Sequence, residues 1–108
     1  MQEQFTLLIV EDSLVLSQLY ASYLRNSAYQ IIKVESIKAA EKAYRKHNPA
    51  LILLDVQLPD GNGLDFLSEL MLNAEPPAVI VMTAHGTSDI AVSAIERGAF
   101  DFLTKPNS

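Results

Sequence analysis

Short apolar stretches recur along the chain and are separated by longer segments with helical periodicity. The stretches are four or five residues long and occupy residues 6–10, 30–34, 51–54, 78–82 and 100–103. Two of them, LLIV and LILL, do not alternate with polar residues, which is typical of strands buried on both faces of a parallel sheet. Buried helix segments are the alternative, but the stretches are short for helices. We therefore predict five strands.

Four of the intervening segments are predicted to be helices. The apolar residues of the first follow the i, i+3, i+4, i+7 spacing of one helix face, which predicts a helix over residues 13–26 with its inward face formed by Leu16, Leu19, Tyr20, Tyr23 and Leu24. Further helices are expected over residues 37–47, 64–73 and 88–97.

Start and stop signals agree with these boundaries. Asn48, followed by proline, should end the second helix, and a turn over residues 60–63 precedes the third. Thr87 or Ser88 can cap the start of the fourth helix, and Gly98 suits the position after its end.

Strict alternation of strands and helices predicts an α/β fold with helices on both faces of a parallel sheet. We expect a flavodoxin-like, doubly wound five-stranded sheet with strand order 2-1-3-4-5. With 108 residues there is room for one domain, which we place at residues 5–106. A fifth helix would normally cover one face of the sheet, and it is missing from this chain. We expect a domain truncated at its C-terminal end, or another cover for that face.

The amino-acid composition excludes several classes of function. Eight basic and thirteen acidic residues give a net charge of −5, so this segment lacks the basic surface that nucleic acid requires. No cysteine is present, which excludes a disulfide framework, a thiol nucleophile and a thiolate metal site. No apolar run is long enough to span a membrane, and the N-terminus does not resemble a signal peptide. We expect a cytoplasmic domain without a membrane or nucleic-acid partner.

Polar residues follow four of the predicted strands. Glu11 and Asp12 come after the first, Asp55 after the third, Thr83 after the fourth and Lys105 after the fifth. Because ligands of open α/β sheets bind beyond the carboxyl ends of the strands, these groups should meet at one edge. Each alone has an ordinary explanation as a helix-start acid, a turn residue, a cap or a solvated lysine.

Together, the three carboxylates require compensation. Two carboxylates about 5 Å apart repel by about 3 kcal/mol at an effective dielectric near 20. Lys105 supplies one positive charge, and a divalent ion would supply two more. Oxygen ligands select a hard cation such as Mg²⁺. The two histidines, His47 and His85, have no spacing typical of a zinc site.

Carboxylates, Mg²⁺, a lysine and a hydroxyl together suggest phosphoryl transfer through an aspartyl phosphate. Asp55 is the best nucleophile candidate, because it follows a wholly apolar strand and precedes a loop. Glu11 and Asp12 are better placed to hold the metal.

These residues lie in recognisable motifs. The set VED (10–12), LLD (53–55), LPDGNG (58–63), MTAHG (82–86) and FLTKP (102–106) resembles the receiver domain of bacterial two-component response regulators. The resemblance implies that Asp55 is the phosphorylated residue. It also implies that Asp12 binds the metal directly, Glu11 through water, and Gln57 through its backbone carbonyl.

The resemblance assigns switching roles as well. Thr83 would turn its hydroxyl toward the phosphoryl group, Lys105 would pair with it, and Phe102 would swing inward when Thr83 moves. Gln57 and His85 match two variable positions that tune the lifetime of the phosphate. The bond between Lys105 and Pro106 matches one that is typically cis.

The implied function is a phosphorylation-dependent signalling switch. Its phosphoryl group would come from a phosphohistidine on a sensor histidine kinase or a histidine phosphotransfer protein, with docking near an exposed Leu14–Val15 pair; a solely structural role for this pair is the alternative. It would not be an enzyme beyond Mg²⁺-dependent self-phosphorylation from a donor and autodephosphorylation.

The stretch from MTAHG to FLTKP also resembles receivers of nitrogen-regulation and quorum-sensing transcription activators. A homodimer is possible but cannot be assumed without the fifth helix. Two alternatives stay open: a phosphatase of the haloacid-dehalogenase type, and a pseudo-receiver that acts as an unphosphorylated interaction module.

Overall fold

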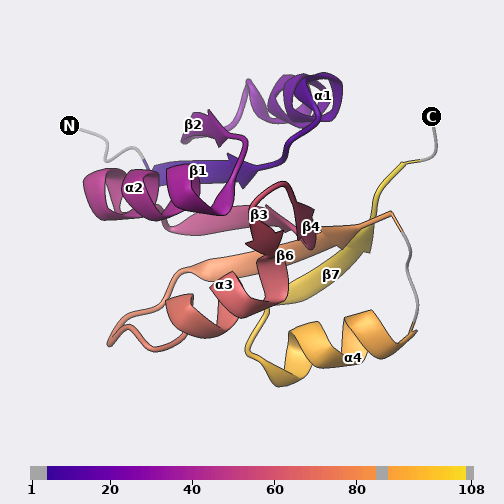
Figure 1. The fold of residues 1–108 in the computed structure, drawn as a ribbon. Coiled ribbons are helices and arrows are strands. Elements are labelled where there is room, and N and C mark those ends of the chain that lie inside the picture. Colours follow the sequence, from indigo (N-terminus) through magenta and orange to yellow (C-terminus); the bar gives the residue numbers. More distant parts are fainter. Residues whose placement is uncertain (1–4, 85–87, 107–108) are drawn as a thin grey trace.

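The fold is a five-stranded parallel sheet flanked by helices (Figure 1). The computed structural model describes residues 5–84 and 88–106. The sheet strands, in the spatial order β2-β1-β3-β6-β7, are β2 (Tyr29–Val34), β1 (Phe5–Val10), β3 (Leu51–Asp55), β6 (Ala78–Thr83) and β7 (Asp101–Thr104). The helices are α1 (Leu14–Leu24), α2 (Ile37–His47), α3 (Gly63–Leu70) and α4 (Ser88–Glu96). The predicted doubly wound sheet and its strand order are confirmed.

A small hairpin between β3 and α3 was not predicted. Residues read from the sequence as a loop and turn form β4 (Gln57–Leu58) and β5 (Gly61–Asn62), which pair in antiparallel orientation. Strands of two residues show no hydrophobic periodicity, so a sequence pattern cannot reveal them. The hairpin matters because it follows Asp55 directly.

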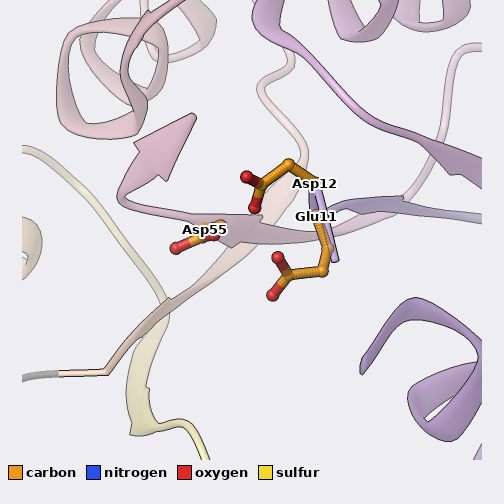
Figure 2. Close-up of side chains that lie close together, drawn as sticks. All are labelled: Glu11, Asp12 and Asp55. Atoms are coloured by element: carbon orange, nitrogen blue, oxygen red, sulfur yellow. The ribbon is translucent and has the colours of Figure 1, made fainter. Parts of the chain in front are cut away.

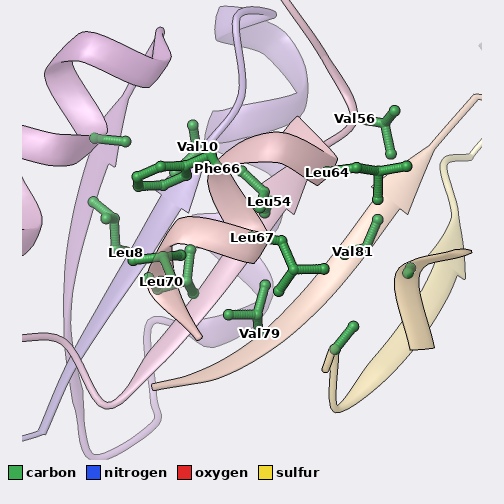
Figure 3. Packing of buried hydrophobic residues seen from close by; sticks show 14 residues of the cluster. Leu8, Val10, Leu54, Val56, Leu64, Phe66, Leu67, Leu70, Val79 and Val81 are labelled. Atoms are coloured by element: carbon green, nitrogen blue, oxygen red, sulfur yellow. The ribbon is translucent and has the colours of Figure 1, made fainter. Parts of the chain in front are cut away.

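The main core lies between the sheet and helices α2, α3 and α4, which cover one face (Figure 1). Helix α3 supplies four of its large side chains, Leu64, Phe66, Leu67 and Leu70. Figure 3 shows them packed against Leu8, Val10, Leu54, Val79 and Val81 of the three central strands. This apolar layer fixes the strand ends that carry the site.

Helix α1 packs against the opposite face through Tyr20, Ala21 and Leu24. The prediction for its inward face was partly wrong: the exposed fraction of Tyr23 is 74%, whereas Ser17 is 4% exposed. Apolar residues occur all around this helix, so their spacing does not select one face. The observed stripe runs through positions 17, 20, 21 and 24.

Beside α1, the same face of the sheet carries an apolar cavity of about 250 Å³. Its lining includes Leu7, Leu53 and Ile80 from the strands and Tyr20 from α1. Within residues 5–84 and 88–106, α1 is the one helix on this face (Figure 1).

The predicted helix ends are largely confirmed. Asn48 adopts a left-handed conformation (φ 46°) and its N–H donates to the carbonyl of Tyr44. Gly98 follows α4 with φ 105°. The side chains of Ser13, Ser36 and Asn62 cap α1, α2 and α3. Thr87, an expected cap of α4, lies outside the described residues.

In the part of the chain that the structure describes, every helix is too short or too polar to cross a membrane.

Candidate functional site

Three carboxylates meet at the carboxyl edge of the sheet (Figure 2). Glu11 and Asp12 follow β1 directly, and Asp55 is the last residue of the neighbouring strand β3. One oxygen from each lies within 4.8 Å of the others. Glu11 and Asp55 are buried, with 1% and 2% of their surface exposed, whereas Asp12 is exposed. The predicted convergence of these side chains is observed.

Lys105 provides the positive charge inside this group. Its Nζ lies 2.7 Å from Asp55 Oδ2 and 2.8 Å from Glu11 Oε1. The backbone places it there, because the N–H of Lys105 donates to the carbonyl of Thr83 at the end of β6. Among the described residues, Lys105 is the cation within ion-pair distance of the cluster. One positive charge therefore faces three carboxylates.

Burial and pairing shift the acidity of two of these groups. Burial raises the pKa of Glu11, although Lys105 and the N–H of Ser13 act in the opposite direction. Burial alone would lower the pKa of Lys105, but its hydrogen bond to Asp55 and its ion pair with Glu11 outweigh that effect, and the pKa is raised. Lys105 stays charged while Glu11 favours its neutral form more than a solvated glutamate does.

The residues fit a divalent cation of the Mg²⁺ type. The donors are all oxygens, and their negative charge exceeds what Lys105 neutralises. Hard cations of this kind take one or two carboxylates and keep several waters. The exposed side chain of Asp12 leaves one side of the cluster open to solvent. Glu11, Asp12 and Asp55 could therefore hold the ion.

The segment after Asp55 folds back tightly against it. The N–H of Gln57 donates to Asp55 Oδ1 (3.2 Å), and the N–H of Gly63 donates to the carbonyl of Val56 (2.7 Å). A Cβ on Gly63 would lie 2.1 Å from the carbonyl oxygen of Asp55. Only glycine at position 63 allows the backbone of α3 to approach the carbonyl of Asp55 this closely. The sequence pattern did not reveal this contact, although a glycine between the Asn62 cap and an apolar helix was a signal for it.

Thr83 lies on β6, the strand next to that of Asp55, and Phe102 lies on β7, one strand further across the sheet. Thr83 ends β6, one residue after the register partner of Asp55, and is buried. Phe102 lies on β7 opposite Val81 and packs, half-buried, against the core on the side of α2, α3 and α4. Thr83 therefore lies beside the strand end that carries Asp55, and the switching roles of Thr83 and Phe102 stay predictions.

Two other expectations have different outcomes. The bond between Lys105 and Pro106 is trans, because the described residues contain no cis peptide; the cis prediction was wrong. Trans is the intrinsically favoured isomer by about 0.5–1 kcal/mol, and the exposed Pro106 lacks enclosing packing that could select cis. His85 lies outside the described residues.

Comparison with known proteins identifies the family. Residues 7–108 match the response regulator receiver domain, and the chain belongs to this family. It is 37% identical over 108 residues to the transcriptional regulatory protein DpiA of Escherichia coli K12, covering 98% of this chain. It is 40% identical over 98 residues to the regulatory protein LuxO of Vibrio cholerae, covering 91% of this chain.

A solved structure is similar over nearly the whole chain. It is the signal receiver domain of a putative LuxO repressor protein from Vibrio parahaemolyticus, with 42% identity and a TM-score of 0.91 over 98% of this chain and 82% of that one. The chain spans 48% of DpiA and 22% of LuxO. These likenesses confirm the predicted resemblance. Family membership implies phosphorylation-dependent signalling and an acidic Mg²⁺ pocket.

Proposed function

We propose that the chain accepts a phosphoryl group on Asp55 from a phosphohistidine and changes its surface in response. In this step the P–N bond of the donor breaks, and a bond forms between phosphorus and an oxygen of Asp55. The observation that carries the proposal is the buried Asp55 carboxylate, fixed through Oδ2 by Lys105 and through Oδ1 by the N–H of Gln57.

Asp55 fits the nucleophile better than its two neighbours. Burial raises the pKa of Glu11, so at a given pH a larger fraction of this residue is neutral and unable to attack than for a solvated glutamate. Asp12 is exposed and is not paired with Lys105. Asp55 is buried and is held through both of its oxygens, Oδ2 by Lys105 and Oδ1 by the N–H of Gln57, so its carboxylate is fixed in one orientation.

The other residues have supporting roles in this proposal. Glu11, Asp12, Asp55 and the backbone carbonyl of Gln57 would hold Mg²⁺. When bound, the ion supplies positive charge for the phosphoryl oxygens. Lys105 pairs with one phosphoryl oxygen, and Thr83 turns its hydroxyl toward another.

The change in Thr83 is then passed to the surface. Phe102, which has no hydroxyl and lies on the strand next to Thr83, changes its packing against the core. The face formed by α4 and β7 changes shape as a result. The response depends on a difference in stability between two arrangements of this face. Gln57 and His85 would tune the lifetime of the phosphate.

The two rival functions are separable. Haloacid-dehalogenase phosphatases require DxDxT after the nucleophile strand, whereas residues 55–59 of this chain read DVQLP. A pseudo-receiver would not be phosphorylated at all. Membership in the receiver family and the complete set of acidic residues and lysine favour the phosphorylated switch.

Intact-mass measurement tests the proposal. Wild type, incubated with acetyl phosphate and Mg²⁺, should gain one phosphoryl group, and Asp55→Asn should gain none. Asp12→Asn is the matched control, because it also removes one carboxylate from the cluster. It should still be phosphorylated, but slowly, since it weakens metal binding and keeps Asp55. Equal modification of wild type and Asp55→Asn would exclude Asp55, and an unmodified wild type would favour a pseudo-receiver.

A donor protein is proposed to dock beside the site on α1. Leu14 and Val15 are 67% and 75% exposed and follow Asp12 within three residues. The partner would be a sensor histidine kinase or a histidine phosphotransfer protein. Val15→Glu should slow transfer from such a protein and leave the reaction with acetyl phosphate unchanged. If both reactions are unchanged, Val15 is not part of a docking surface.

The whole protein is proposed to regulate transcription, as the name of DpiA says of that relative, and to act in the cytoplasm. A receiver domain over residues 5–106 of a longer chain, and a homodimer, stay predictions.

A further inference from the structure

Asp60 connects two loops that lie far apart in the sequence. It lies at the turn of the β4–β5 hairpin, and its two carboxylate oxygens reach the start of α2. Oδ1 accepts the N–H of Ile37 (2.8 Å) and Oδ2 accepts the N–H of Lys38 (3.0 Å). Hydrogen bonds to a carboxylate are stronger than neutral ones, and a helix N-terminus attracts negative charge. Both bonds lower the pKa of Asp60, so it stays ionised near neutral pH.

These bonds are additional to the ordinary cap of α2. Ser36 already caps the helix, because its hydroxyl accepts the N–H of Ala39 (3.1 Å). The hairpin is also pressed against α2, since a Cβ on Gly61 would lie 2.9 Å from Ile37 Cδ1. The two Asp60 bonds therefore hold the hairpin against α2, in addition to capping the start of that helix.

The two segments that Asp60 joins, the hairpin and the start of α2, are each connected to the carboxylate cluster through a hydrogen bond that a backbone N–H donates. On the hairpin side, the N–H of Gln57 donates to Asp55 Oδ1. On the other side, α2 follows β2, whose last residue Val34 accepts the N–H of Glu11 (3.0 Å). Asp60 thus joins the hairpin that carries Gln57 to the start of α2, the helix that follows the strand supporting Glu11.

We propose that Asp60 is a positioning residue that keeps the backbone of Gln57 beside Asp55 and thereby sets the affinity for a divalent cation. This inference rests on the proposed metal site and deepens it. Asp60 itself does not touch the ion, and it acts through the hairpin.

The test is a Mn²⁺ titration followed by the electron paramagnetic resonance signal of the free ion. Asp60→Ala should raise the Kd by about three- to tenfold, below the range usual for partners that touch a metal ligand directly. Asp60→Asn keeps one acceptor oxygen and should have an intermediate effect. Ser36→Ala is the matched control, because it removes a cap from the same helix without touching the hairpin.

The expected pattern separates positioning from helix stability. Both alanine variants should unfold at lower temperature, whereas only Asp60→Ala should bind Mn²⁺ more weakly. Wild-type affinity in Asp60→Ala, or equal weakening in Ser36→Ala, would overturn the role of Asp60 while leaving the metal site intact. If wild type itself fails to bind Mn²⁺, both the proposed metal site and the proposed role of Asp60 are wrong.

Discussion

Among single residues, Glu11 shows that the site is arranged for a positive charge beyond that of Lys105. Its carboxylate is buried, and Lys105 divides its charge between Glu11 and Asp55. Burial raises the pKa of Glu11 despite that pairing. Without a metal ion, the ionised Glu11 therefore destabilises the folded state relative to a neutral group of the same shape.

Glu11→Gln should stabilise the metal-free protein, because burial makes the ionised carboxylate less favourable in the folded state and Lys105 keeps Asp55 as its partner. Urea unfolding in EDTA measures the difference. The same variant should bind Mg²⁺ more weakly. A Glu11→Gln protein that is less stable than wild type in EDTA would contradict this account.

The advantage of Glu11→Gln should also depend on pH. Since folding raises the pKa of Glu11, the folded state binds its proton more tightly than the unfolded state does. In wild type the unfavourable contribution is therefore relieved as the pH falls through the folded pKa toward the ordinary value of 4.5. The stability difference between wild type and Glu11→Gln in EDTA should shrink over that range, and a growing difference would reverse the assigned direction.

Among the helices and strands, the buried central strands were the elements that the sequence predicted most clearly. The apolar strands LLIV and LILL are both central and buried, and the acids that follow them lie at one edge. The inward face of α1 was less predictable, because Tyr23 is exposed and Ser17 is buried. The strands of the hairpin are too short to show a pattern, and the bonds of Asp60 join residues more than 20 positions apart, which no local pattern contains.

Helix α3 should be the most sensitive element, because it fills the centre of the main core. Leu67 is fully buried, so Leu67→Ala should destabilise the protein by about 2–5 kcal/mol. Leu72→Ala is the matched control: Leu72 is 85% exposed, and the effect should stay within about 0.5 kcal/mol. Urea unfolding measures both variants, and similar values for the two would contradict the packing in Figure 3.

For the molecule as a whole, metal binding and folding stability are linked. The carboxylates follow β1 and β3, which come together only in the folded sheet, so Mg²⁺ should favour the native state. At a free concentration 100 times the Kd, the gain for one site is about 2.7 kcal/mol. Thermal unfolding at increasing Mg²⁺ should show a rising Tm in wild type. Asp12→Asn should show a smaller rise, and an identical rise would mean that the ion binds elsewhere.

The pairing of Lys105 with Asp55 spans 50 positions of the chain. During synthesis, the acidic residues leave the ribosome well before the lysine, because β7 follows the other four strands of the sheet in the sequence. A nascent chain thus contains Asp55 long before it contains the ammonium group that balances its charge. The charge cluster should therefore be completed only after residue 105 has been synthesised.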